Sequence, residues 1–85
     1  MNAPALKLRR GLLQALAAIP PGYLLPEDTL RADAARVVIP RPTTAALDQE
    51  LAALDSQRLI IGVDTEEGRK WRIADAGRAW LAEHG

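Results

Sequence analysis

Side chains that could carry out covalent chemistry are few in this 85-residue sequence, and they lie far apart. The chain has no cysteine, its only serine is Ser56, and its only histidine, His84, is the penultimate residue. Nucleophilic catalysis needs a nucleophile together with a base that activates it, and metal sites usually combine several histidines, cysteines or carboxylates. The adjacent carboxylates Glu27 and Asp28 are typical of a helix start. We therefore expect no catalytic residue, no metal site, no cofactor and no enzymatic activity.

The charge of the chain is balanced. Eleven Lys and Arg residues stand against eleven Asp and Glu residues, so the formal net charge is zero at pH 7. Such a chain lacks the global positive field that steers strongly basic proteins toward nucleic acids or anionic membranes. Its apolar stretches are far shorter than the roughly 20 residues of a membrane-spanning helix, and no signal peptide is recognisable. We expect a cytoplasmic protein with no membrane partner.

Four stretches repeat their apolar residues at the spacing of helices that bury one face. The first cannot continue through Pro20 and Pro21, because proline interrupts a helix. Thr43 or Thr44 is expected to cap the third helix, and Asp75 the fourth. The predicted helices span residues 4–19, 26–37, 43–57 and 75–84.

The apolar stripes predict which side chains form the core. Tyr23 is expected to fill the space at the end of the first helix, and Val37 to lie on the buried stripe of the second. Lys7, Arg9 and Arg10 are interpreted as solvated charges of the first helix. The inward-facing residues are predicted to be Ala5, Leu8, Leu12, Leu13, Leu16 and Ile19, then Leu30 and Ala34, then Leu47, Leu51 and Leu54.

A β-hairpin is predicted over residues 59–73. Trp71 and Ile73 alternate with Lys70 and Arg72, so Trp71 is expected to face the core and cover the third helix. An isolated two-stranded hairpin is marginal in water, so the helices must support it. With a short extended segment before the second helix, the predicted fold is α+β and mostly helical. Its order is helix, short strand, helix, helix, hairpin, helix.

Two motifs in this chain resemble winged-helix regulators of the MarR-like and PadR-like kind. Leu47-x-x-x-Leu51-x-x-Leu54-x-x-x-x-Leu59-Ile60 is similar to their recognition helix running into the first wing strand. Trp71-Arg72-Ile73-Ala74-Asp75-Ala76-Gly77-Arg78 is similar to the run that enters their last helix. Such families usually have glycine where this chain has Arg58, and threonine where it has Ala74. The resemblance implies a single winged helix-turn-helix domain over residues 1–85.

The resemblance also implies binding to double-stranded DNA, with the third helix in the major groove and the hairpin, or wing, on the adjacent phosphates. Thr44, Asp48 and Gln49 are the candidates to face bases. The third helix is a poor anchor by itself, because it carries Asp48, Glu50 and Asp55 and has no Lys or Arg before Arg58. The candidate phosphate contacts lie on either side of it in the sequence. They are Arg36, Arg41, Lys70 and Arg72.

Two functions from different classes therefore remain open. The first is a small DNA-binding protein, acting as a homodimer in transcriptional regulation or as an accessory protein of a phage or mobile element. The second is an adaptor that uses the same fold to dock a protein partner without binding DNA, which the zero net charge favours. Small side chains on the outer face of the third helix, such as Ala52, would let another backbone approach closely. Trp80 and Leu81 on the last helix are the other interface candidates, although Trp80 could instead pack on the first helix.

Overall fold

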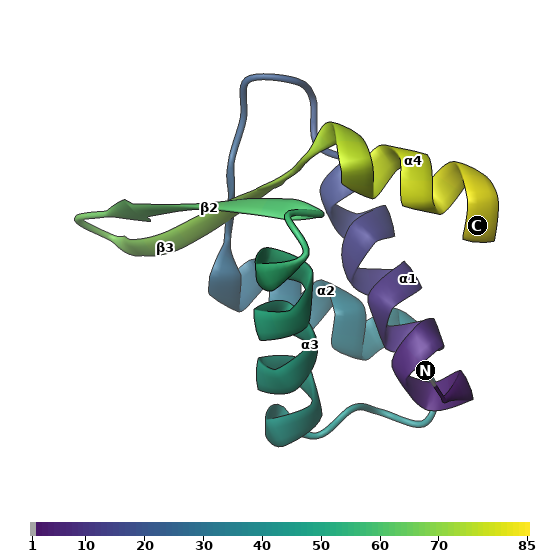
Figure 1. Cartoon of the computed structure of the whole chain (residues 1–85). Coiled ribbons are helices and arrows are strands. Elements are labelled where there is room, and N and C mark those ends of the chain that lie inside the picture. Colours follow the sequence, from purple (N-terminus) through teal and green to yellow (C-terminus); the bar gives the residue numbers. More distant parts are fainter. Residues whose placement is uncertain (1) are drawn as a thin grey trace.

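Residues 2–85, which the computed structural model describes, form four helices and a three-stranded antiparallel sheet (Figure 1). The predicted α+β class is confirmed, and each helix begins and ends within two residues of its predicted bounds. The sheet lies across one end of α3, and the hairpin tip projects away from α1 and α4 (Figure 1). The elements are α1 (Ala3–Ala17), β1 (Leu25–Pro26), α2 (Glu27–Val37), α3 (Thr44–Ser56), β2 (Ile60–Thr65), β3 (Gly68–Ile73) and α4 (Asp75–His84).

Leucines from the first three helices form the centre of a single core. Leu12, Leu13, Leu30 and Leu54 have no exposed surface, and Trp71 covers them from the sheet side. Each such side chain contributes roughly 1.5–3 kcal/mol of hydrophobic free energy. Of the residues predicted to face inward on these helices, the leucines and Ala34 are buried, whereas Ala5 and Ile19 are only half-buried.

Two apolar residues predicted to be buried are exposed. Tyr23 is 66% exposed, because a turn closed by the bond from its N–H to the carbonyl of Pro20 carries its side chain outward. Leu25 packs against the core in its place. Val37 is also 66% exposed. The chain leaves helical geometry at the next residue, so Val38 turns inward instead and is 8% exposed.

Side-chain caps start two of the helices. Asn2 Oδ1 accepts from the N–H of Ala5 at 2.8 Å, and Thr43 Oγ1 accepts from the N–H of Ala46 at 3.0 Å. Each bond satisfies an N–H that has no partner within the first helical turn. The prediction that Asp75 caps α4 is wrong, because Ala74 holds the cap position and Asp75 is already the first helical residue. Its carboxylate still lies where the helix dipole favours negative charge.

The central strand of the sheet is β3, with β1 on one side and β2 on the other. Gly62 of β2 lies opposite Trp71, and a Cβ at this glycine would come within 2.7 Å of the indole ring. Glycine is therefore required here to make room for the ring. The face of the hairpin away from the core carries Ile61, Val63, Lys70 and Arg72. Within residues 2–85, no strand pairs with the outer edge of β2.

A left-handed residue joins α3 to β2. Arg58 has a φ of 59°, a conformation that glycine adopts more readily than other residues. The N–H of Leu59 donates to the carbonyl of Leu54 at 2.9 Å, and the N–H of Arg58 donates to that of Asp55 at 3.0 Å. These two bonds define a Schellman motif, which ends α3 and directs the chain into the sheet.

The start of α4 packs closely on this same junction. The N–H of Ala74 donates to the carbonyl of Leu59 at 3.0 Å, and a Cβ at Gly77 would lie 2.3 Å from that carbonyl oxygen. Among the described helices, none is long and apolar enough to cross a lipid bilayer.

Candidate functional site

The outer face of α3 is exposed along its length and carries small or uncharged side chains together with two aspartates. Two of the predicted base-facing residues, Thr44 and Gln49, lie on it. The third, Asp48, is exposed on the same face together with Asp55, and both border a cleft beneath the hairpin. The exposed residues of the outer face are Thr44, Ala45, Asp48, Gln49, Ala52, Asp55 and Ser56.

Two of the three carboxylates of α3 are neutralised by cations from other helices. Asp48, predicted to face bases, accepts a bond at 2.5 Å from Arg31 of α2. Glu50 is buried and accepts from Arg9 Nε at 2.6 Å. Asp55 is exposed and makes no ion pair within residues 2–85. The helix therefore presents less negative charge than its sequence indicates.

The interpretation of Arg9 as a solvated charge is wrong. Its side chain is buried between α1, α3 and α4, where Nη1 donates to Gln57 Oε1 at 3.0 Å and Cζ lies 5.8 Å from the centre of the Trp80 ring. The sequence held one signal for this pair. Glu50 lies three residues after Leu47 and four before Leu54, on the buried stripe of α3, and a buried carboxylate needs a cation.

Two of the predicted phosphate contacts already form ion pairs within the described chain, and two do not. Lys70 Nζ lies 3.3 Å from Glu67 Oε1, and Arg36 is paired with Asp33 one turn earlier. Arg41 and Arg72 are exposed and form no ion pair with any described residue. These two are therefore the predicted contacts that remain available to a partner.

A cross-strand ion pair neutralises the base of the hairpin turn. Arg69 Nε and Nη2 donate to the two carboxylate oxygens of Asp64 at 2.8 and 3.3 Å. These hydrogen bonds and the charge of Arg69 hold the pKa of Asp64 below its ordinary value, and Asp64 in turn raises the pKa of Arg69.

Polar contacts run from α3 through α2 to the hairpin. Asp48 binds Arg31, the Nε of Arg31 lies 3.4 Å from Glu27 Oε2, and the indole N–H of Trp71 donates to Glu27 Oε1 at 2.9 Å. Burial alone would lower the pKa of Arg31, but its hydrogen bonds and attraction to Asp48 and Glu27 raise it. Arg69 completes the series, with Cζ 5.2 Å from the centre of the Trp71 ring. These residues border a cleft of about 270 Å³ between α2, α3 and the hairpin.

The interface candidates are not all equally accessible. Ala52 is exposed on the outer face of α3. Trp80 and Leu81 are half-buried and pack against the core of their own chain. The Trp80 ring also stacks on His84, with 4.3 Å between the ring centres. Much of the apolar surface of Trp80 is therefore already covered within the chain.

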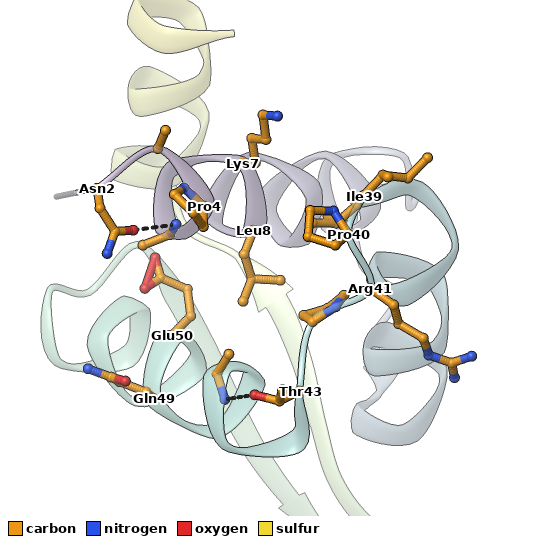
Figure 2. Close-up of a pocket in the computed structure, with 15 residues that line it drawn as sticks. Asn2, Pro4, Lys7, Leu8, Ile39, Pro40, Arg41, Thr43, Gln49 and Glu50 are labelled. Carbon is orange, nitrogen blue, oxygen red and sulfur yellow. Dashed lines mark hydrogen bonds between the residues drawn. The ribbon is translucent and has the colours of Figure 1, made fainter.

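A larger hollow, of about 450 Å³, lies between the start of α1, residues 38–43 and the first half of α3 (Figure 2). Leu8 and Pro40 line it, and the carboxylate of Glu50 points toward the start of α1. The charged ends of Lys7 and Arg41 point away from it (Figure 2). The hollow is mostly apolar, and its charged lining is confined to Glu50, which Arg9 already neutralises, and to these two cations at its rim.

No known protein family, curated protein or solved structure matches this chain. Within residues 2–85, no group of three or more His, Asp or Glu side chains could hold a metal ion. Ser56 and His84 are exposed on α3 and α4. The most distinctive surface is the outer face of α3, with Arg41 before the helix in the chain and Arg72 on the hairpin.

Proposed function

We propose that this chain is a winged-helix domain that binds double-stranded DNA, with α3 in the major groove and the β2–β3 hairpin as the wing. Its role would be that of a transcriptional regulator or of an accessory protein of a phage or mobile element. A homodimer would suit this role, because two-fold operators present two half-sites about one helical turn apart.

The observation that best supports this proposal is that cations from α1 and α2 neutralise two of the carboxylates of α3. Arg31 and Arg9 pair with Asp48 and Glu50, so Asp55 is the carboxylate of α3 that is left without a partner cation in the described chain. A DNA phosphate repels an unpaired carboxylate but is much less affected by a neutral ion pair. Exposed Gln49 could form paired hydrogen bonds with adenine, and Ala52 could contact a thymine methyl group.

Arg41 and Arg72 supply the phosphate contacts in this proposal. Arg41 precedes α3 in the chain and Arg72 lies on the face of the hairpin away from the core, and neither forms an ion pair with a described residue, so both cations would be free to meet phosphates. Each phosphate that a protein neutralises releases counterions and steepens the salt dependence of binding.

A titration of the protein with mixed-sequence duplex DNA at low and at moderate salt tests the proposal. We expect binding that weakens steeply with salt. The double variant Arg41→Ala/Arg72→Ala should bind more weakly and lower the slope of log K against log salt by about 1.8, because each phosphate that is no longer neutralised removes about 0.9.

The matched control is Lys7→Ala/Arg78→Ala. It removes the same charge from two exposed cations of α1 and α4, the helices away from the hairpin tip, and neither cation forms an ion pair with a described residue. This control should leave the salt slope unchanged. Equal losses in both double variants would show that net charge, rather than the α3 and hairpin surface, controls binding. Absence of binding at low salt would contradict DNA binding itself.

The adaptor function is the second candidate, because the exposed Ala45, Ala52 and Ser56 would let a partner helix pack closely on α3. The change Ala52→Arg separates the two functions. A long cation would block close protein packing, whereas on mixed-sequence duplex, where binding depends mainly on phosphates, its charge would offset the lost methyl contact and keep the affinity. Affinity capture with wild-type and Ala52→Arg baits, together with the DNA titration, measures both effects. Docking that survived this change would exclude the outer face of α3 as the protein interface.

A further inference from the structure

Glu27 occupies a junction between three elements. It is the first residue of α2 and follows directly on β1, whose Leu25 and Pro26 pair with β3. One of its carboxylate oxygens accepts from the indole N–H of Trp71 in β3, and the other lies 3.4 Å from Arg31 Nε. Through these two contacts the carboxylate joins the hairpin to α2.

The same contacts reach α3. Arg31 lies one turn after Glu27 and binds Asp48, so a single carboxylate connects Trp71 of the hairpin with the helix that carries Thr44 and Gln49. Trp71 is 3% exposed and therefore cannot find another polar partner in solvent while the hairpin stays in place. Side chains held in this way have few alternative arrangements, and this rigidity transmits position between elements.

We infer that Glu27 is a positioning residue that fixes the hairpin relative to α3, so that both can contact one DNA duplex. This inference rests on the proposed DNA binding. Glu27 touches no phosphate in this scheme, and as an anion it would weaken the attraction to DNA if it acted by charge alone. The two roles therefore predict opposite signs when the carboxylate is removed.

The test compares Glu27→Ala with Asp28→Ala in the same duplex titration. Asp28 is the next residue in the first turn of α2, is exposed, and has no ion pair within the described chain, so both changes remove one negative charge from the same place. Charge alone predicts tighter binding by both variants. Positioning predicts that Asp28→Ala binds as tightly as wild type or tighter, while Glu27→Ala binds roughly tenfold more weakly, the loss expected for one charge-assisted contact.

Two further variants distinguish positioning from general loss of stability. Glu27→Gln keeps an oxygen that can accept from Trp71 and should retain most of the affinity. Trp71→Phe keeps a ring in the core but removes the indole N–H, and it should weaken binding as Glu27→Ala does without any change in charge. Thermal unfolding of each variant shows that it is folded at the temperature of the titration.

A double-mutant cycle with Arg72→Ala gives the sharpest readout. In wild type this change should lower the salt slope by about 0.9. In the Glu27→Ala background it should lower it far less, because the displaced hairpin no longer reaches its phosphate. Wild-type binding combined with equal affinities for Glu27→Ala and Asp28→Ala would overturn the positioning role alone. A wild-type protein that binds no duplex would overturn the proposed function.

Discussion

The buried ion pair of Arg9 and Glu50 links α1 to α3 inside the core. Both side chains are more than nine-tenths buried, and the 2.6 Å bond between them is supported by Gln57. Arg9 Nη2 is buried with no hydrogen-bond partner in the described chain, which subtracts roughly 1–3 kcal/mol from what the pair contributes. The net stabilisation is small, yet the loss of either partner alone would leave an uncompensated charge in the core.

The change Glu50→Ala should therefore reduce the free energy of unfolding by roughly 3–5 kcal/mol, measured by urea denaturation. Replacing both partners, as Arg9→Met/Glu50→Leu, should restore most of this loss. Arg36→Ala breaks an exposed pair within one helix and should change stability by less than about 1 kcal/mol. A cost below about 1 kcal/mol for Glu50→Ala would show that Arg9 reaches water in the variant.

The pair of Asp64 and Arg69 predicts a pH effect at the base of the hairpin turn. Arg69 lowers the pKa of Asp64 in the folded chain, so the ionised form is favoured by folding. The contribution to stability is present above the unfolded pKa of about 3.9 and is lost as the pH falls through the lower folded value. NMR titration of the Asp64 carboxyl should place its midpoint below the ordinary range. Arg69→Gln should raise that midpoint, whereas Arg72→Ala should leave it in place.

At the scale of elements, the helices and the hairpin could be predicted because each is encoded locally. Apolar spacing in α1 and α3 follows the helical period, and Trp71 and Ile73 alternate as a strand requires. The departures arise where the chain leaves a regular element. Tyr23 and Val37 lie at such points, where a single residue of turn geometry decides which side chain is buried. Thr44 and Gln49 could be placed on the exposed face of α3 by period alone.

Which charged residues of the candidate site are paired was harder to predict, because these ion pairs join residues far apart in the sequence. Arg31 and Asp48 are separated by 17 residues, and Arg9 and Glu50 by 41. The spacing of residues within one helix does not predict which charged residue of another helix will pair with it. The contact between Glu27 and Trp71 depends on the register of β1 against β3, which a two-residue strand does not reveal in its sequence.

The junction between α3 and β2 gives a prediction at this scale. A left-handed conformation costs a non-glycine residue roughly 1–2 kcal/mol, and Arg58 bears this cost. Glycine would remove the strain but lose more conformational entropy on folding. We expect Arg58→Gly to raise the free energy of unfolding by about 0.5–1 kcal/mol in urea denaturation. Arg58→Ala keeps the strain and should change stability little, and an equal gain in both variants would refute this account.

At the scale of the whole molecule, the net charge is zero, but the positive side chains differ in whether they are already in ion pairs. Ion pairs hold Arg9, Arg31, Arg36, Arg69 and Lys70, so the positive side chains that remain available belong to a smaller set. In the proposed DNA-binding role, the affinity depends on where the unpaired cations lie, and the net charge of the chain says little about it.

The outer edge of β2 bears on how the purified protein behaves at high concentration. An open strand edge can pair with the same edge of another copy, and proteins often place charges along it to prevent this. Here Val63 is 38% exposed on that strand, and repulsion between copies vanishes near the isoelectric point of about 6.6. Light scattering of a concentrated solution should therefore rise with time near that pH and stay flat well above it. Val63→Glu, which places a carboxylate opposite Lys70, should keep the solution clear at both pH values.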